Sequence, residues 1–219
     1  MLRALQVACL LVFLSTSVYS QSNQEQPTVT FTLDFPGSQP GHYSVQVQSD
    51  GKAHYESSGK PFPESDEGDS FDYEFTISTA AREKIFGLSA KADFFQKDLD
   101  SHRKNMAFTG KKTLVYKDTE RSGESTYNYS PDLAVQELTS LFQGLSATLE
   151  FGHRLEYALR YQKLALADEL KRMEESARLA PPVEIQAITP ILQQIIADPG
   201  VINVTRARAQ RLLERSGGR

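Results

Sequence analysis

The chain has 219 residues, with 24 lysines and arginines against 28 aspartates and glutamates, so its formal net charge at neutral pH is −4. A mildly acidic chain does not present the basic surface that general nucleic-acid binding requires, and we expect no nucleic-acid partner. The length is sufficient for one domain with a substantial core or for two small domains.

Residues 1–20 have the order of a secretory signal peptide. Arg3 supplies a positive charge, residues 4–14 are nearly all apolar, and small residues follow up to Ser20, after which we expect cleavage. The apolar run is too short for a membrane-spanning helix, although an N-terminal anchor is the alternative. Cleavage would remove Cys9, the one cysteine, and would exclude thiol catalysis and zinc–thiolate sites. An exported chain without disulfides indicates a bacterial periplasm or exterior.

Four segments in the first part of the chain alternate apolar and polar residues, which is the pattern of a half-buried β-strand. They are residues 28–35, 42–49, 53–57 and 70–77. Asp50-Gly51 is a strong hairpin signal between the second and third segments. Strands with one polar face predict an antiparallel meander whose apolar face must be covered by other elements.

The stretch 109–130 contains Gly110-Lys-Lys-Thr, which has part of the composition of a phosphate-binding loop. It lacks the spacing of that motif, and the residues that follow favour a strand rather than a helix. The stretch instead predicts a β-hairpin with its turn at Ser122-Gly123, which would place Tyr116 opposite Tyr129.

Helices are expected to cover the apolar face of the sheet. Ser78 can cap a helix over 79–90, and Ser130 can cap another whose apolar stripe contains Leu138, Leu141 and Leu145. We expect this stripe to bury the sheet face that carries Phe31, Val45, Tyr73 and Phe75.

The C-terminal part of the chain also has helical spacing. A second helical run follows Gly152, and whether residues 153–179 form one helix or two is left open. Two short helices joined at Asp198-Pro199 close the chain, and this segment resembles part of a HEAT-type helical pair. Since a solenoid needs at least three such units, the resemblance implies only a local helical hairpin.

The sequence therefore predicts an α+β fold, an antiparallel β-meander and hairpin sheet packed on one face by helices, with a helical C-terminal region. The expected organisation is residues 21–130 as the sheet with one or two short helices, and residues 131–219 as a helical region that packs on the sheet. One continuous domain over residues 28–219 is the alternative.

Residues that could carry catalysis are dispersed along the chain. The motifs of serine hydrolases and of His-Glu-x-x-His metalloproteases are missing. Asp98, Asp100 and His102 combine carboxylate oxygens with an imidazole and could hold a divalent ion. A metal-dependent hydrolase that uses these three residues is one functional alternative. The acidic segment 64–74 could bind calcium, but it departs from the EF-hand pattern.

The C-terminal segment is basic and contains candidate partner contacts, Arg206, Arg208, Arg211 and Arg215. Because clustered catalytic residue types are missing, we expect an exported, non-catalytic binding protein whose partner is a protein or a cell-envelope component. A structural envelope protein is the other alternative. We expect no enzyme activity, no cofactor and no membrane span after signal cleavage.

Overall fold

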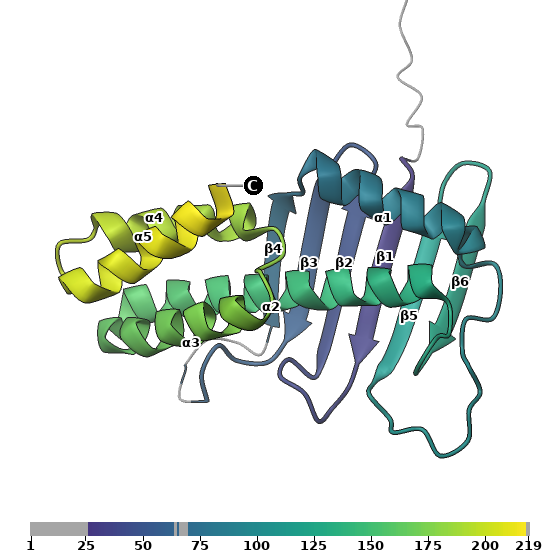
Figure 1. Ribbon diagram of the computed structural model, residues 1–219, viewed down its shortest axis with the longest axis horizontal. Coiled ribbons are helices and arrows are strands. Elements are labelled where there is room, and N and C mark those ends of the chain that lie inside the picture. Colours follow the sequence, from purple (N-terminus) through teal and green to yellow (C-terminus); the bar gives the residue numbers. More distant parts are fainter. Residues whose placement is uncertain (1–25, 64, 66–69, 218–219) are drawn as a thin grey trace, which may run out of the picture.

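The structure is a computed structural model that describes residues 26–63, 65 and 70–217. The predicted signal peptide and residues 64 and 66–69 of the acidic segment lie outside the described residues. A six-stranded antiparallel sheet has the strand order β4-β3-β2-β1-β5-β6 (Figure 1). Its strands are β1 (Thr28–Asp34), β2 (His42–Gln48), β3 (Lys52–Ser58), β4 (Ser70–Thr76), β5 (Lys111–Lys117) and β6 (Ser122–Tyr127).

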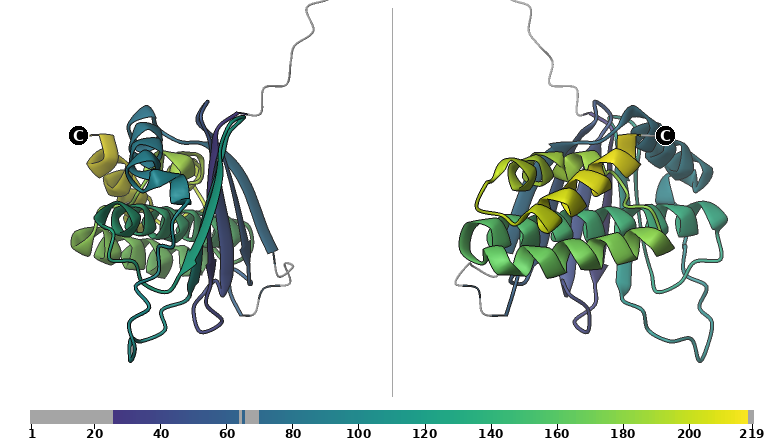
Figure 2. Two further views of the ribbon diagram at one scale, coloured as in Figure 1. Left: turned by 90° about the vertical axis from the view of Figure 1, so that its right-hand side faces the viewer. Right: turned by 60° about the vertical axis from the view of Figure 1, so that its left-hand side comes forward.

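The helices lie on one face of this sheet, and no helix of the described residues lies against its other face (Figure 2). They are α1 (Thr79–Lys91), α2 (Leu133–Tyr161), α3 (Leu166–Leu179), α4 (Thr189–Ala197) and α5 (Asn203–Gly217), with short 3-10 turns η1 (Asp93–Phe95), η2 (Lys163–Ala165) and η3 (Ile185–Ile188). The α+β fold with helices on one face is confirmed. Within the described residues, no helix combines the length and apolarity needed to cross a bilayer.

The predicted alternation of the first four strands is confirmed. On β1, Val29, Phe31 and Leu33 are buried while the intervening side chains are only partly covered. The register places Phe31 opposite Val45 of β2 and Leu114 of β5, so that one apolar face runs across the centre of the sheet. Strand β4 lies at the edge, and its apolar residues are only half-buried.

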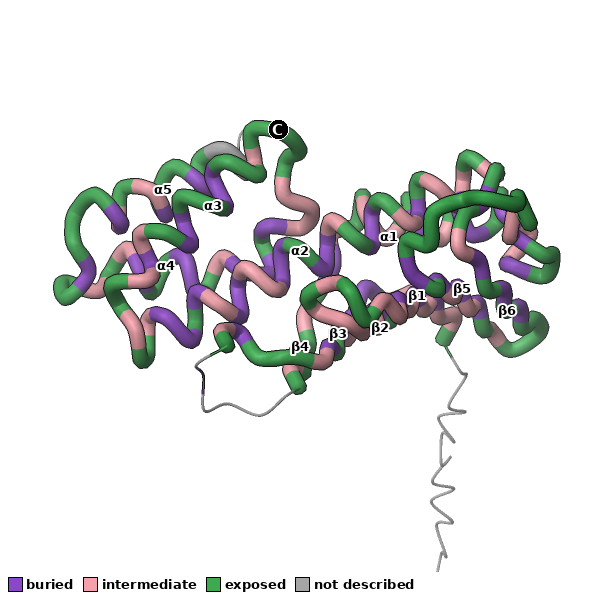
Figure 3. Tube along the Cα trace, turned by 90° about the horizontal axis from the view of Figure 1, so that it is seen from below, coloured by how far each residue is buried: buried purple, intermediate pink, exposed green. Residues whose placement is uncertain are grey.

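Helix α2 covers the centre of the apolar face and then continues beyond the edge strand β4 (Figure 1). Its 29 residues give a length of about 43 Å. Buried positions recur along both halves (Figure 3), because the first half faces the sheet and the second half faces α3 and α4. The helical C-terminal region therefore packs mainly on the part of α2 that the sheet does not reach.

The core between α2 and the sheet contains the predicted residues and one that the leucine spacing did not single out. Phe31, Val45, Leu138 and Leu145 are fully buried, and Leu141 is also buried. Tyr73 and Phe75 of β4 are half-buried, so the predicted burial is confirmed only in part. Phe142 stacks on Phe31 with ring centroids 5.2 Å apart and an interplanar angle of 4°.

The cap predicted for α1 is confirmed, since the Ser78 hydroxyl accepts a hydrogen bond from the Ala81 amide at 3.2 Å. The cap predicted for α2 is wrong, because the N-cap is Asp132 and not Ser130. The Asp132 carboxylate accepts from the first free amides of the helix, at 2.7 Å from Ala134 N. A charged acceptor at this position is also favoured by the helix dipole.

The hairpin of β5 and β6 is present, but its predicted register is wrong. Tyr116 lies opposite Gly123, not opposite Tyr129. The turn spans 118–121, where Asp118 accepts from the Arg121 amide at 2.6 Å. Gly123 is needed for a tertiary contact, since a Cβ there would lie 2.1 Å from the carbonyl oxygen of Phe94.

The helical break predicted at Gly152 is also wrong, because α2 runs through it to Tyr161. The missing side chain at Gly152 makes room for Ile188 of η3, whose Cγ2 would lie 2.5 Å from a Cβ. The chain leaves the helix at Gln162, so residues 153–179 belong to two helices. The predicted hairpin of α4 and α5 is confirmed.

Candidate functional site

A cleft of about 610 Å³ opens where the second half of α2 meets two loops of the sheet. One wall is formed by the β1–β2 loop between Pro36 and Gly41, and another by residues 58–63, which comprise the last residue of β3 and the loop after it. The helical side carries Glu150, Phe151 and Arg154 of α2 together with Glu169 and Arg172 of α3. Two loops and two helices therefore line the cleft, which contains several ionisable side chains.

The carboxylate of Glu150 is held by hydroxyl groups of β3. Its Oε1 atom accepts from Tyr55 Oη at 2.8 Å and from Ser57 Oγ at 2.7 Å. Tyr55 also shares a hydrogen bond of 2.9 Å with Ser146 of α2. Burial is the largest cause that raises the pKa of Tyr55, and the charge of Glu150 is the second. The phenol therefore stays neutral and available as a donor.

A second cluster joins α2 to α3 around Glu169, which is fully buried. Arg154 Nε donates to Glu169 Oε2 at 3.1 Å, and Arg172 Nη2 donates to Oε1 of the same carboxylate. The Arg154 guanidinium also lies 4.6 Å from the ring centroid of Phe151. Burial lowers the pKa of Arg154, and the nearby Glu150 charge opposes this change.

These contacts determine what the cleft can do chemically. General acid–base catalysis needs a group within hydrogen-bond reach of the substrate proton. In the described cleft, Glu150 is engaged by two hydroxyls and Glu169 by two guanidinium groups. The two carboxylates therefore link the sheet to α2 and α2 to α3.

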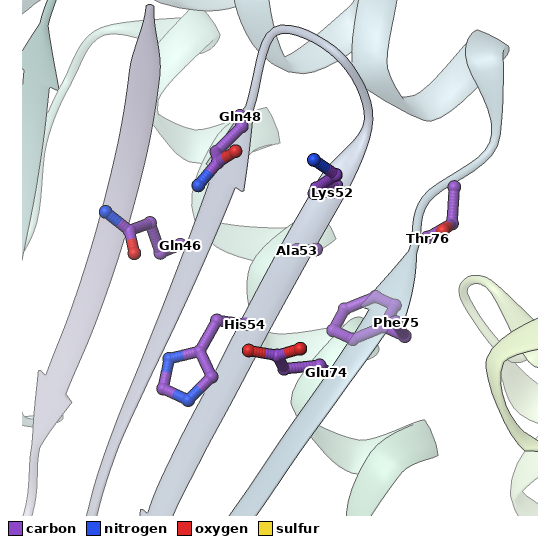
Figure 4. A pocket seen from close by; sticks show the side chains of 8 residues that line it. All are labelled: Gln46, Gln48, Lys52, Ala53, His54, Glu74, Phe75 and Thr76. Atoms are coloured by element: carbon purple, nitrogen blue, oxygen red, sulfur yellow. The ribbon is translucent and has the colours of Figure 1, made fainter. Parts of the chain in front are cut away.

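A second hollow of about 290 Å³ lies on the open face of the sheet, across β2, β3 and β4 (Figure 4). Its polar side chains include Gln46, His54 and Glu74, and the register places His54 directly opposite Glu74. His54 Nε2 lies 2.9 Å from Asp72 Oδ2. This hollow is smaller than the cleft and involves strands only.

Asp98, Asp100 and His102 are brought together in the loop between η1 and β5. His102 Nε2 lies 2.6 Å from Asp98 Oδ2, and this contact raises the pKa of His102. Asp100 Oδ1 accepts from the His102 amide and Oδ2 from the Asn128 amide, both at 2.6 Å. These acceptors are engaged in fixing the loop, and no cluster of described His, Cys, Asp or Glu side chains is arranged to hold a metal ion. The metal-dependent hydrolase stays a prediction.

We expect Asp100→Ala to lower the free energy of unfolding by about 1–3 kcal/mol, because two backbone amides lose a charged acceptor. Hydrogen bonds from these amides lower the pKa of Asp100 below its ordinary 3.8. A lowered folded-state pKa gives stability that is present above the unfolded-state pKa and is lost as pH falls through the folded-state value. The difference between wild type and variant, measured by urea unfolding, should therefore disappear in strong acid.

Calorimetric titration of the same two proteins with divalent ions tests the alternative. Saturable heat in the wild type that is lost in Asp100→Ala would favour the metal-dependent hydrolase.

The structure places two of the four candidate partner-contact arginines against α3. Arg211 Nε donates to Glu174 Oε1 at 3.0 Å, and Arg208 Nε lies 3.7 Å from Oε2 of the same carboxylate. Arg206 donates to Asn203, and the side chain of Arg215 lies outside the described part of the structure. Partner binding by these residues stays a prediction, although Arg208 and Arg211 already pair within the chain.

The charged residues of the cleft were not found from the sequence. Glu150 and Arg154 are one helical turn apart, a spacing that also occurs on solvated helix faces. No motif connects them with Glu169, which lies on the next helix. No protein-family model matches this chain, and no curated protein matches its sequence.

Proposed function

We propose that the protein is an exported, non-catalytic binding protein, located in a bacterial periplasm or outside the cell, whose cleft receives its partner. The observation that carries the proposal is the cleft of about 610 Å³ with its carboxylates held in internal contacts. Ligand sites typically have volumes of about 300–1,000 Å³ and a few fixed polar groups in an apolar lining.

The lining of the cleft supports this reading. Apolar surface comes from Phe62, Phe151 and the four loop prolines Pro36, Pro40, Pro61 and Pro63. Proline restricts the backbone, so the two loops lose less conformational entropy when a partner binds than flexible loops would. Lys60 and Arg172 add exposed positive groups to the cleft. A component of the cell envelope with both apolar and anionic groups would fit this lining.

Filling the cleft should abolish binding of the partner. We expect Gln39→Trp, at an exposed position in the lining, to weaken binding at least about tenfold, equivalent to about 1.4 kcal/mol. The partner would first be captured from envelope extract with the wild type, then purified and titrated calorimetrically. The matched control is Gln143→Trp, which adds the same ring at an exposed position of α2 outside the lining.

Equal affinity of the two tryptophan variants would contradict the cleft as the binding site. Turnover of the captured component by the wild type would contradict a non-catalytic role. A purely structural envelope protein, the alternative expected from sequence, would show no saturable binding in this titration.

A further inference from the structure

The later part of the loop between η1 and β5, from Ser101 onward, forms with strand β5 a segment that is both basic and apolar. From Ser101 to Lys117 the chain has five lysines and arginines and no aspartate or glutamate, although its overall charge is −4. Residues 102–109 are all exposed. Met106 is 37% exposed and Phe108 is 59% exposed, so two large apolar side chains lie in a locally cationic segment. The loop projects past the ends of the strands at the lower right of Figure 1.

Specific contacts hold this loop in place. The Asn128 side chain accepts from the Thr109 amide at 2.8 Å and donates to the Ala107 carbonyl at 3.0 Å. The buried ammonium of Lys112 donates to the carbonyls of Thr109 and Asn128, at 3.1 and 2.9 Å. Phe108 makes an edge contact with Phe35, with centroids 5.8 Å apart. The exposed side chains are therefore presented on an ordered backbone.

The acids in the earlier part of the loop and on the neighbouring strand β1 already have partners. Asp98 contacts His102 at 2.6 Å, and Asp100 accepts from backbone amides. Asp34, which lies opposite Lys111 in the register, contacts His42 at 2.6 Å. No ion pair of Arg103, Lys104 or Lys111 is found among the described residues. Two cations of the loop and Lys111, the first residue of β5, thus carry a charge that no direct contact compensates in the described structure.

We propose that this loop binds the surface of an anionic lipid membrane. Met106 and Phe108 would enter the interface between headgroups and acyl chains, and Arg103, Lys104 and Lys111 would contact headgroup phosphates. Each basic residue near the membrane is attracted appreciably to its anionic surface, and exposed apolar side chains add to the binding. A projecting loop matches a broad anionic surface better than a cavity in a protein partner. The proposal goes beyond the cleft and does not depend on it.

The proposal is tested by cosedimentation of residues 21–219, the chain expected after signal cleavage, with lipid vesicles. We expect the wild type to sediment with vesicles of phosphatidylglycerol and phosphatidylcholine, to remain in solution with phosphatidylcholine alone, and to be released by salt. The double variant R103E/K104E should bind at least about tenfold more weakly, because two attractive charges become repulsive. Phe108→Ser should bind more weakly at every salt concentration.

The matched control is L164S/K171E, which makes similar changes at exposed positions of η2 and α3. It should bind as the wild type does. Since Phe108 contacts Phe35, thermal unfolding checks the fold of Phe108→Ser, while R103E/K104E changes only exposed charges. Failure of the wild type to bind anionic vesicles, or equal binding by R103E/K104E, would overturn the proposal. An acidic protein that binds the loop when vesicles do not would also overturn it.

Discussion

Phe142→Ala is expected to lower the free energy of unfolding by about 3–5 kcal/mol, the usual cost of removing a fully buried aromatic side chain. Phe142 has no exposed surface and stacks on Phe31, which is also fully buried. The substitution would leave a cavity between α2 and the centre of the sheet. Because this contact joins the helical layer to the sheet, the loss should affect the whole cooperative transition.

Urea unfolding followed by circular dichroism measures this effect. Leu133→Ala is a suitable control, because Leu133 lies on the same helix and is 79% exposed. The control should change the free energy of unfolding by less than about 0.5 kcal/mol. A loss below about 1 kcal/mol for Phe142→Ala would mean that α2 is not essential to the core.

The strands were predictable because their signal is local. Apolar residues alternate with polar ones at Val29, Phe31 and Leu33 because one face of the sheet is buried, and this pattern does not depend on which element covers that face. The register of the second hairpin depended on tertiary contacts that the sequence does not display. Asp118 provides acceptors for the turn, and Gly123 admits the Phe94 carbonyl. Ser122-Gly123 therefore resembled a turn, but Gly123 lies in β6, where it allows the close approach of the Phe94 carbonyl.

The cleft could not be predicted for a related reason. Its ionisable groups belong to helices whose relative position is set by packing, and glutamate and arginine are common on solvated helix faces. Glu169 has an ordinary sequence environment, yet it is fully buried by the contact between α2 and α3. The candidate that the sequence did offer, around Asp98 and His102, is a compact loop because neighbouring acceptors satisfy its backbone amides.

The cleft and the loop between η1 and β5, for which we propose membrane binding, lie at the same end of the sheet. Pro36 belongs to the lining of the cleft, and the preceding residue, Phe35, contacts Phe108 of the loop. If both proposals hold, membrane binding would place the cleft close to the lipid surface.

A partner from the envelope would then meet the cleft in a restricted orientation, which reduces the entropic cost of association. The loop variants would then weaken partner capture on vesicles without changing affinity in solution.

Glu169→Ala is expected to lower the free energy of unfolding by about 3–5 kcal/mol, because removing one member of a buried ionic cluster leaves the other charges uncompensated. Arg154 is partly buried and its pKa is already lowered by burial. Without the carboxylate, its guanidinium would lose this ion pair and keep the contact with Phe151 and the attraction of Glu150. The effect should be measured by urea unfolding.

The control for this prediction is Glu156→Ala, which breaks the exposed contact with Arg160 one turn along α2. It should change stability by less than about 0.5 kcal/mol, because water screens an exposed pair. E169A/R154M removes the carboxylate together with Arg154, the more buried of its two arginine partners, and should recover part of the loss. Equal destabilisation by the single and double variants would show that the cost arises from altered helix packing and not from an uncompensated charge.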